Sequence, residues 1–137
     1  MKQNGLVPEL YCANLSETLD FYTRILGFQI LFERQEERFA YLQKGNAQIM
    51  IEELGAGRQW ITAELQKPFG RGINLQIETD AIDNLHNTIL GNGYVLMLPL
   101  EDKWYPQKDK IVGNRQLAIQ DPDGYLLRFY QNLGNRY

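Results

Sequence analysis

Residues 20–28 read DFYTRILGF, and this stretch decides the fold of the first half of the chain. It continues a helical spacing of apolar residues that begins near residue 15 and stops at Gly27, a residue that commonly ends helices. Asn14 and Glu17 form a capping box in front of this helix. Strand-like runs surround it, over residues 6–12, 28–33, 38–42 and 47–53. The first half therefore reads strand, helix and three strands.

The second half repeats this order around a turn motif, QDPDGY, at residues 120–125. The tripeptide ILG at residues 25–27 recurs at residues 89–91, again at the end of a helical pattern. We expect a helix over residues 80–90, strands over residues 73–78, 93–98, 111–120 and 125–131, and a long loop over residues 99–110.

The predicted fold is α+β, with two tandem βαβββ modules over about residues 1–54 and 72–137. Residues 55–71 contain glycines and a proline without a clear period, and they form the connector. One such module leaves a sheet face uncovered. We therefore expect a single domain, residues 1–137, in which the two modules form a curved, barrel-like mixed sheet around a cavity.

Composition excludes several classes of function. The net charge of −3 supplies no positive field for nucleic acid. Cys12 and His86 are the single cysteine and histidine, so a disulfide within the chain and Cys/His zinc sites are excluded. No run approaches the roughly 20 apolar residues of a membrane span, and the N-terminus does not resemble a signal peptide. We expect a cytoplasmic protein that binds neither nucleic acid nor membranes.

The two motifs, DFYTRILGF after a strand and QDPDGY before the last strand, resemble those of the vicinal oxygen chelate superfamily. That superfamily includes glyoxalase I, extradiol dioxygenases, fosfomycin-resistance enzymes and bleomycin resistance proteins. The resemblance covers nearly the whole length. Both motifs are folding signals that enzymes and non-enzymes share, so they support the paired-module fold and leave the function open.

The resemblance also implies where a metal would bind. Superfamily enzymes hold a divalent metal with one residue from each of four strands, usually His, Glu, His and Glu. The corresponding positions here are Val7, Met50, Asn74 and Arg128. Valine has no donor atom, a thioether is too soft for these metals, and a guanidinium repels a dication. We therefore expect no metal and no other cofactor, and we expect the four residues to converge on one cavity.

Aromatic and polar side chains remain as candidates for ligand binding. Period-two alternation places Phe39 and Tyr41 on one sheet face, and Met50 and Glu52 on one face of the neighbouring strand. Large aromatic side chains in loops either cover the core or bind a planar ligand, and both interpretations stay open. The predicted ligand-binding residues are Phe39, Tyr41, Met50, Glu52, Trp60, Asn74, Trp104, Tyr105 and Arg128.

Two functions remain, and a third possibility is a member of this fold whose natural ligand is not an antibiotic, which the sequence does not separate from the first. Bleomycin resistance proteins also lack the metal ligands and sequester a cationic, planar-tailed antibiotic as arm-exchanged dimers. This resemblance implies a non-catalytic homodimer that binds a small planar or cationic ligand, with the connector around Trp60 as the exchanged segment. The alternative is a lyase, isomerase or dioxygenase with an atypical or absent metal, using Glu52, Tyr41 and Arg128 for acid/base chemistry. We expect neither His86 nor Cys12 to be catalytic.

Overall fold

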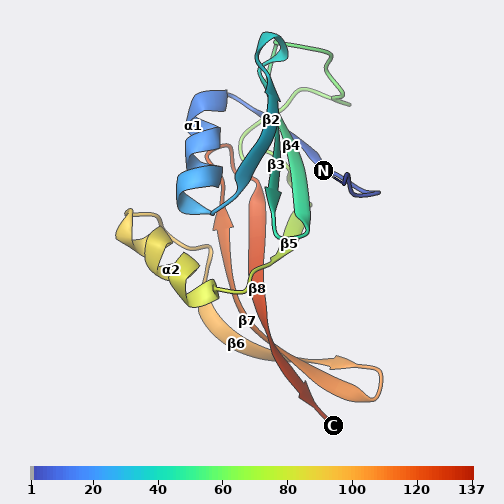
Figure 1. The fold of residues 1–137 in the computed structure, drawn as a ribbon, viewed down its shortest axis with the longest axis vertical. Helices are drawn as coiled ribbons and strands as arrows, with labels where there is room; N and C mark the ends of the chain where they lie inside the picture. Colours follow the sequence, from blue (N-terminus) through green and yellow to red (C-terminus); the bar gives the residue numbers. More distant parts are fainter. Residues whose placement is uncertain (1) are drawn as a thin grey trace. The chain divides into compact units, whose positions relative to one another are not determined.

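The computed structural model describes residues 2–137 and has two compact units, one reaching Phe69 and the other spanning Gly70–Tyr137. Each unit combines one four-stranded sheet with one α-helix (Figure 1). The first contains β1 (Glu9–Cys12), α1 (Leu15–Asp20), β2 (Gln29–Arg34), β3 (Phe39–Lys44) and β4 (Ala47–Glu53). The second contains β5 (Asn74–Glu78), α2 (Ile82–Gly91), β6 (Leu98–Gln107), β7 (Lys110–Gln120) and β8 (Leu126–Arg136).

The two sheets have the same topology. Their strand orders are β1-β4-β3-β2 and β5-β8-β7-β6, which are equivalent when each module is numbered from its own first strand. In both, the first strand runs parallel to the last, and the remaining pairs are antiparallel. The predicted α+β fold of two tandem βαβββ modules is therefore confirmed.

The DFYTRILGF stretch forms the core of the first module. Asn14 caps α1, because its side-chain oxygen accepts a hydrogen bond from the Glu17 amide at 3.0 Å. The helix then widens into a π-helical turn, η1 (Phe21–Ile25). The ring of Tyr22 packs edge-on against those of Phe21 and Phe28, with centroids 5.7 and 5.6 Å away. This burial explains the motif as a folding signal.

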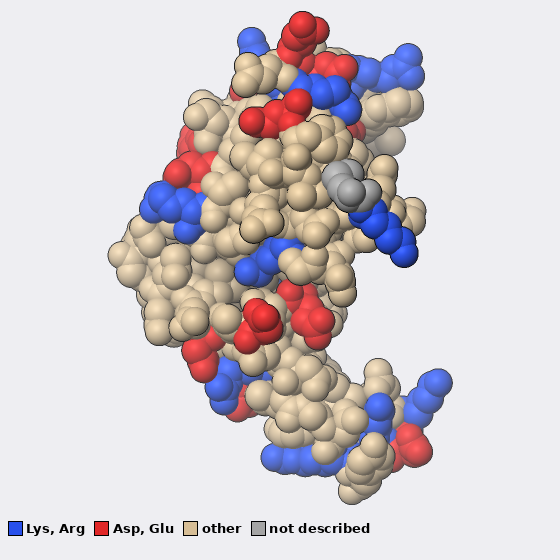
Figure 2. Space-filling view, viewed as in Figure 1, with Lys and Arg blue, Asp and Glu red and all other residues tan. Residues whose placement is uncertain are grey.

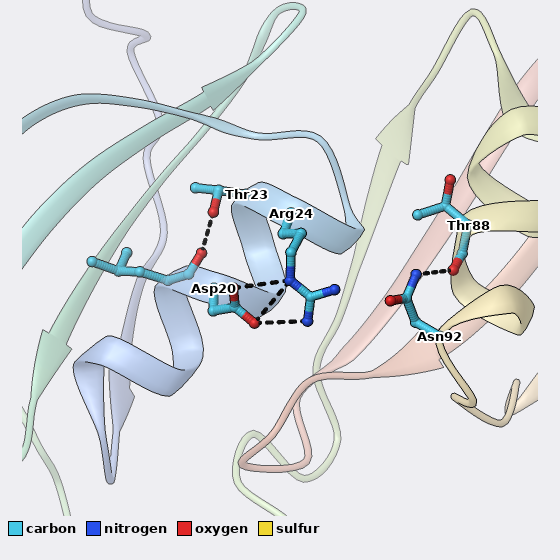
Figure 3. A network of polar contacts seen from close by, with 6 residues as sticks. Asp20, Thr23, Arg24, Thr88 and Asn92 are labelled. Atoms are coloured by element: carbon cyan, nitrogen blue, oxygen red, sulfur yellow. Dashed lines mark hydrogen bonds and ion pairs between the residues drawn. The ribbon is translucent and has the colours of Figure 1, made fainter.

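Local hydrogen bonds stabilise both helical segments (Figure 3). At η1, the guanidinium of Arg24 binds the Asp20 carboxylate with both Nε and Nη2, at 3.0 and 2.9 Å. At the end of α2, the carbonyl of Thr88 accepts hydrogen bonds from both Asn92 Nδ2 at 2.7 Å and the Asn92 amide at 3.2 Å. These contacts fix the helix ends within each module.

The QDPDGY stretch is the predicted turn. Asp121 Oδ1 accepts hydrogen bonds from the amides of Asp123, Gly124 and Tyr125 at 2.9 to 3.0 Å. Gly124 has a φ of 103°, a conformation that favours glycine. The turn therefore sets the register with which β8 begins.

The second module corrects one sequence expectation. Residues 93–98 were expected to be a strand and residues 99–110 a loop, but β6 spans Leu98–Gln107 and pairs with β7. Pro99 and Pro106 made this segment resemble a loop. Because β6 is the edge strand of its sheet, it tolerates proline, which cannot donate to a ladder. β8 also continues to Arg136, beyond the expected end at residue 131.

The longer strands give the second module a twisted ribbon. Figure 1 shows the β6–β7 hairpin and the end of β8 extending together beyond the part of the sheet beside α2. This ribbon carries Lys103, Lys108, Lys110 and Arg136, and Figure 2 shows blue basic side chains on it beside red acidic ones. Within the described residues, no helix is both long and apolar enough to cross a membrane.

Candidate functional site

Four of the predicted site residues share one face of the first module's sheet. In the β3–β4 ladder, Phe39 lies opposite Glu52 and Tyr41 lies opposite Met50. Side chains alternate along each strand, so these four side chains project from the same side. We call this side, together with Tyr11 of β1 and Phe32 of β2, the aromatic face. Phe39, Tyr41 and Glu52 are buried, and Met50 is half-buried.

Phe32 extends the aromatic face to the edge strand. Its ring stacks on Tyr41, with centroids 5.1 Å apart and planes 17° apart, and its centroid lies 6.1 Å from that of Phe39. The side chain remains 37% exposed, so this ring is the accessible part of the stack. Sequence reasoning missed Phe32, because a bulge between Ile30 and Phe32 shifts its pairing with β3. The signal for Phe32 that the sequence did offer was an aromatic residue within the strand QILFER.

A cation already lies on this stack. The guanidinium carbon of Arg34 is 4.0 Å from the centroid of Phe39, within the range of a cation–π contact. Arg34 Nε also donates to the Glu37 carboxylate at 2.9 Å, and both side chains are about half exposed. The aromatic face is therefore able to hold a planar cation, and an exposed side chain of the protein now occupies that position.

Gln48 closes one end of the aromatic face with a satisfied network. Its side-chain oxygen accepts from the Tyr41 hydroxyl at 2.8 Å and from the Asn4 amide at 2.7 Å. Its nitrogen donates to the Lys2 carbonyl and to Gln43 Oε1, both at 2.7 Å. This buried amide thus has its hydrogen-bonding capacity used within the protein, and it holds residues 2–4 against β4.

Glu52 and Tyr11 form the end of the aromatic face opposite to Gln48. Burial raises the pKa of Glu52 above its usual value, and the nearby charges of Glu9 and Glu37 raise it further, while Arg34 opposes the shift. Burial also raises the pKa of Tyr11. The Tyr11 hydroxyl lies 3.0 Å from the Arg58 carbonyl and 2.9 Å from the Trp60 amide, which donates to it.

Trp60 reaches the site through its backbone rather than its ring. The indole is 69% exposed, and the Arg58 guanidinium carbon lies 5.0 Å from its centroid. The backbone around it is held by the Tyr11 hydroxyl. The connector therefore contacts the aromatic face at its Tyr11–Glu52 end, with the Trp60 side chain directed to solvent.

In the second module, Asn74 and Arg128 contact one another. Arg128 Nη1 donates to Asn74 Oδ1 at 3.1 Å across the β5–β8 pair. Asn74 is exposed and Arg128 is half-buried. The guanidinium therefore has a neutral amide partner.

Trp104 and Tyr105 lie on β6 rather than in the expected loop, and as neighbours on a strand they project to opposite faces. The Tyr105 hydroxyl donates to Gln116 Oε1 at 3.1 Å, and Gln116 Nε2 donates to Glu101 at 2.8 Å. Trp104 lies across Gly113 of β7, with the Arg136 guanidinium carbon 3.7 Å from its centroid. The two aromatic residues therefore belong to different local environments.

Comparison with known proteins places the chain in a family. Residues 6–129 match the sequence profile of the Glyoxalase/Bleomycin resistance protein/Dioxygenase superfamily. The chain belongs to this superfamily. Members named bleomycin resistance protein, from Geobacillus stearothermophilus and Staphylococcus aureus (strain MRSA252), are 25% identical to it over 138 residues. Each alignment covers 93% of this chain and 96% of the relative.

Solved structures agree with this assignment at the level of the fold. TioX from Micromonospora sp. ML1 is 22% identical with a TM-score of 0.72, and the match covers 96% of this chain and all of TioX. A protein from the mobile metagenome of V. Pseudocholerae is 20% identical with a TM-score of 0.71, over 96% of each chain.

The positions at which superfamily enzymes hold a metal are distributed over both modules. Val7 precedes β1 and Met50 lies on β4, while Asn74 and Arg128 lie on β5 and β8. Met50 joins the first strand through its amide, which donates to the Pro8 carbonyl at 2.9 Å. Throughout residues 2–137, no group of three or more His, Cys, Asp or Glu side chains is placed to hold a metal ion. The donor set at these positions does not fit a divalent metal.

Proposed function

We propose that this chain is a non-catalytic binding protein that sequesters a planar, cationic antibiotic of the bleomycin type. The observation that carries the proposal is the aromatic face, where the stacked pair Phe32 and Tyr41 lies beside Phe39 and the buried carboxylate of Glu52. Flat rings bind such a surface through contact area, and a carboxylate attracts a positive group. Binding of this kind requires no proton transfer.

The position of Arg34 supports a ligand that is both planar and positively charged. Its guanidinium is itself a planar cation, and it lies over Phe39 while its other partner is the exposed Glu37. An exposed ion pair contributes little to stability, so a ligand ring displaces Arg34 at small cost. The aromatic surface beneath would then contact the ligand.

The superfamily relationship supports the same proposal. Relatives named bleomycin resistance protein align over nearly the whole chain. In this chain the four metal positions carry Val7, Met50, Asn74 and Arg128, which favours binding over metal-assisted chemistry. The proposal includes a homodimer in the cytoplasm, and ligand contacts at Trp60, Asn74, Trp104, Tyr105 and Arg128 stay predictions.

Isothermal titration calorimetry with bleomycin tests the proposal. The wild-type protein is expected to bind, and Phe32→Leu is expected to weaken binding by about 1 kcal/mol, because the substitution removes the accessible ring of the stack. Tyr137→Leu, which removes an exposed ring at the C-terminus, serves as the matched control and should bind as the wild type does. Sedimentation of the same sample should show a dimer.

Absence of a heat of binding with bleomycin at high micromolar concentration would contradict the proposal. Wild-type affinity in Phe32→Leu would remove the aromatic face from the binding site. A monomer in sedimentation would contradict the dimeric part of the proposal alone.

Glu52 supports a second candidate function, an enzyme of the superfamily that works without a metal. A buried carboxyl whose pKa is raised is suited to general acid/base catalysis, and Tyr41 lies on the same sheet face. Under this alternative the ligand is chemically changed. Under sequestration it is released unchanged, and this difference separates the two candidates.

A further inference from the structure

Two buried polar side chains of β4 face the same side of the sheet and differ in their hydrogen bonding. Gln48 and Glu52 are each 5% exposed. Gln48 makes hydrogen bonds to Lys2, Tyr41 and other groups around it. Within the described residues, the Glu52 carboxylate has no hydrogen bond or ion pair. The side chain is largely enclosed but its carboxylate oxygens still reach solvent, so a cationic ligand can contact them and supply a partner that the protein itself does not.

Charges around Glu52 identify what that partner is. Glu9 of β1 and Glu37 after β2 both raise its pKa, as does its burial, and Tyr11 of β1 presents a neutral phenol. The nearby cation, Arg34 of β2, lies over Phe39 and forms its ion pair with Glu37. Negative charge is therefore in excess at Glu52, which favours a positively charged group.

The connector encloses this position. The Tyr11 hydroxyl is bonded to Arg58 and Trp60, so residues 58–60 pass directly beside it. Gly57 lies so close to Glu52 that a Cβ atom on it would be 2.3 Å from Glu52 Oε1. The loop thus packs beside one carboxylate oxygen and limits its contact with water, which strengthens an ion pair formed there.

We propose that Glu52, assisted by Glu9 and the Tyr11 hydroxyl, is the subsite that receives an ammonium or guanidinium group of the ligand. This inference rests on the proposed binding function and assigns the recognition of the ligand's charge to one end of the aromatic face. The planar part of the ligand then lies on the Phe32–Tyr41 stack, and the cation lies at Glu52.

The proposal makes binding depend on pH. A cation pairs with the carboxylate and not with the protonated acid, so affinity rises as pH rises through the pKa of Glu52 in the free protein. The groups that face Glu52 are Glu9 and Tyr11 from β1, Arg34 from β2 and Glu37 from the turn after it. Glu9 adds negative charge beside Glu52 and so also favours the cation, and Arg34 opposes it.

Thermal unfolding with agmatine, a small molecule that carries a guanidinium and an ammonium group, tests the subsite without the antibiotic. Agmatine should raise the Tm of the wild type at neutral pH, and the increase should shrink as the pH falls through the raised pKa of Glu52, because only the ionised site binds it. Glu52→Gln should abolish the increase. Glu17→Gln removes an exposed carboxylate of α1 and should respond as the wild type does. N-butylurea, a neutral probe, should have no effect.

Titration of the same variants with bleomycin distinguishes failure of the Glu52 subsite from failure of the proposed binding function. Glu52→Gln should bind bleomycin about tenfold more weakly, the loss typical of a hydrogen bond to a charged group. Wild-type bleomycin affinity in Glu52→Gln, or an equal agmatine effect in wild type and Glu52→Gln, overturns the subsite and leaves the proposed function standing. Agmatine stabilisation that needs Glu52, without any bleomycin binding, supports the subsite and contradicts the proposed function.

Discussion

Glu52 and Glu53 are neighbours on β4 with opposite environments. Glu52 points to the aromatic face, is buried without a partner, and has a raised pKa. Glu53 points to the other face and accepts a hydrogen bond from the Leu15 amide at 3.0 Å, which lowers its pKa, and an ion pair with Arg38 lowers it further. One carboxylate therefore stabilises the fold in its charged form, and the other opposes folding when it is charged.

This difference predicts opposite effects of the same substitution. The raised pKa of Glu52 means that the folded protein binds its proton more tightly than the unfolded chain does, so stability falls as pH rises through that pKa. Glu52→Gln should therefore raise Tm at neutral pH, with a gain that shrinks below the usual pKa of glutamate. Glu53→Gln should lower Tm at neutral pH, and its loss should shrink in acid, where Glu53 is protonated in either state.

Thermal unfolding at a series of pH values between acid and neutral measures the Tm of both variants. A loss of stability in Glu52→Gln at neutral pH would show that the charged carboxylate is satisfied inside the protein. That result would remove the reason for assigning it to a ligand.

At the scale of elements, much of the fold could be predicted from short sequence motifs. The capping residue Asn14 and the turn residues of QDPDGY act through their own backbone neighbours, so they are readable without knowledge of the tertiary structure. Strand β4 was also predicted with its observed bounds, Ala47–Glu53, because it alternates clearly and follows a tight turn.

Elements whose character depends on their neighbours could not be read in this way. The prolines of β6 are tolerated only because this strand lies at a sheet edge, which is a property of the topology. The bulge in β2 brings Phe32 opposite Tyr41, so the stack depends on a register that the sequence of β2 alone does not specify. The unpaired state of Glu52 likewise required the surrounding structure.

The β6–β8 ribbon gives a prediction about packing. A Cβ atom on Gly113 would lie 2.6 Å from ring atoms of Trp104, so Gly113→Ala should force this ring from its position and destabilise the protein by about 1 to 3 kcal/mol. Gly91→Ala at the end of α2 is the matched control, since its Cβ meets nothing within 4 Å. Equal stability of both variants by urea denaturation would show that Trp104 does not depend on Gly113.

At the scale of the molecule, one topology occurs twice with different side chains. The first module carries aromatic rings and an unpaired carboxylate on β1, β2, β3 and β4. In the second module, Arg128 is bonded to Asn74, and Gln116 joins Tyr105 and Glu101. The shared order of strands agrees with the family assignment, and under the proposed function the difference in side chains assigns the aromatic and acidic part of binding to the first module.

The central claim is that the protein holds its ligand and releases it unchanged. The most direct measurement is to incubate bleomycin with a smaller molar amount of protein, denature the protein, and analyse the released drug by mass spectrometry. The account predicts that all of the drug is recovered with its mass unchanged, and that before denaturation only the amount equivalent to the binding sites is retained by the protein. Modified drug in molar excess over protein would show turnover and would contradict sequestration.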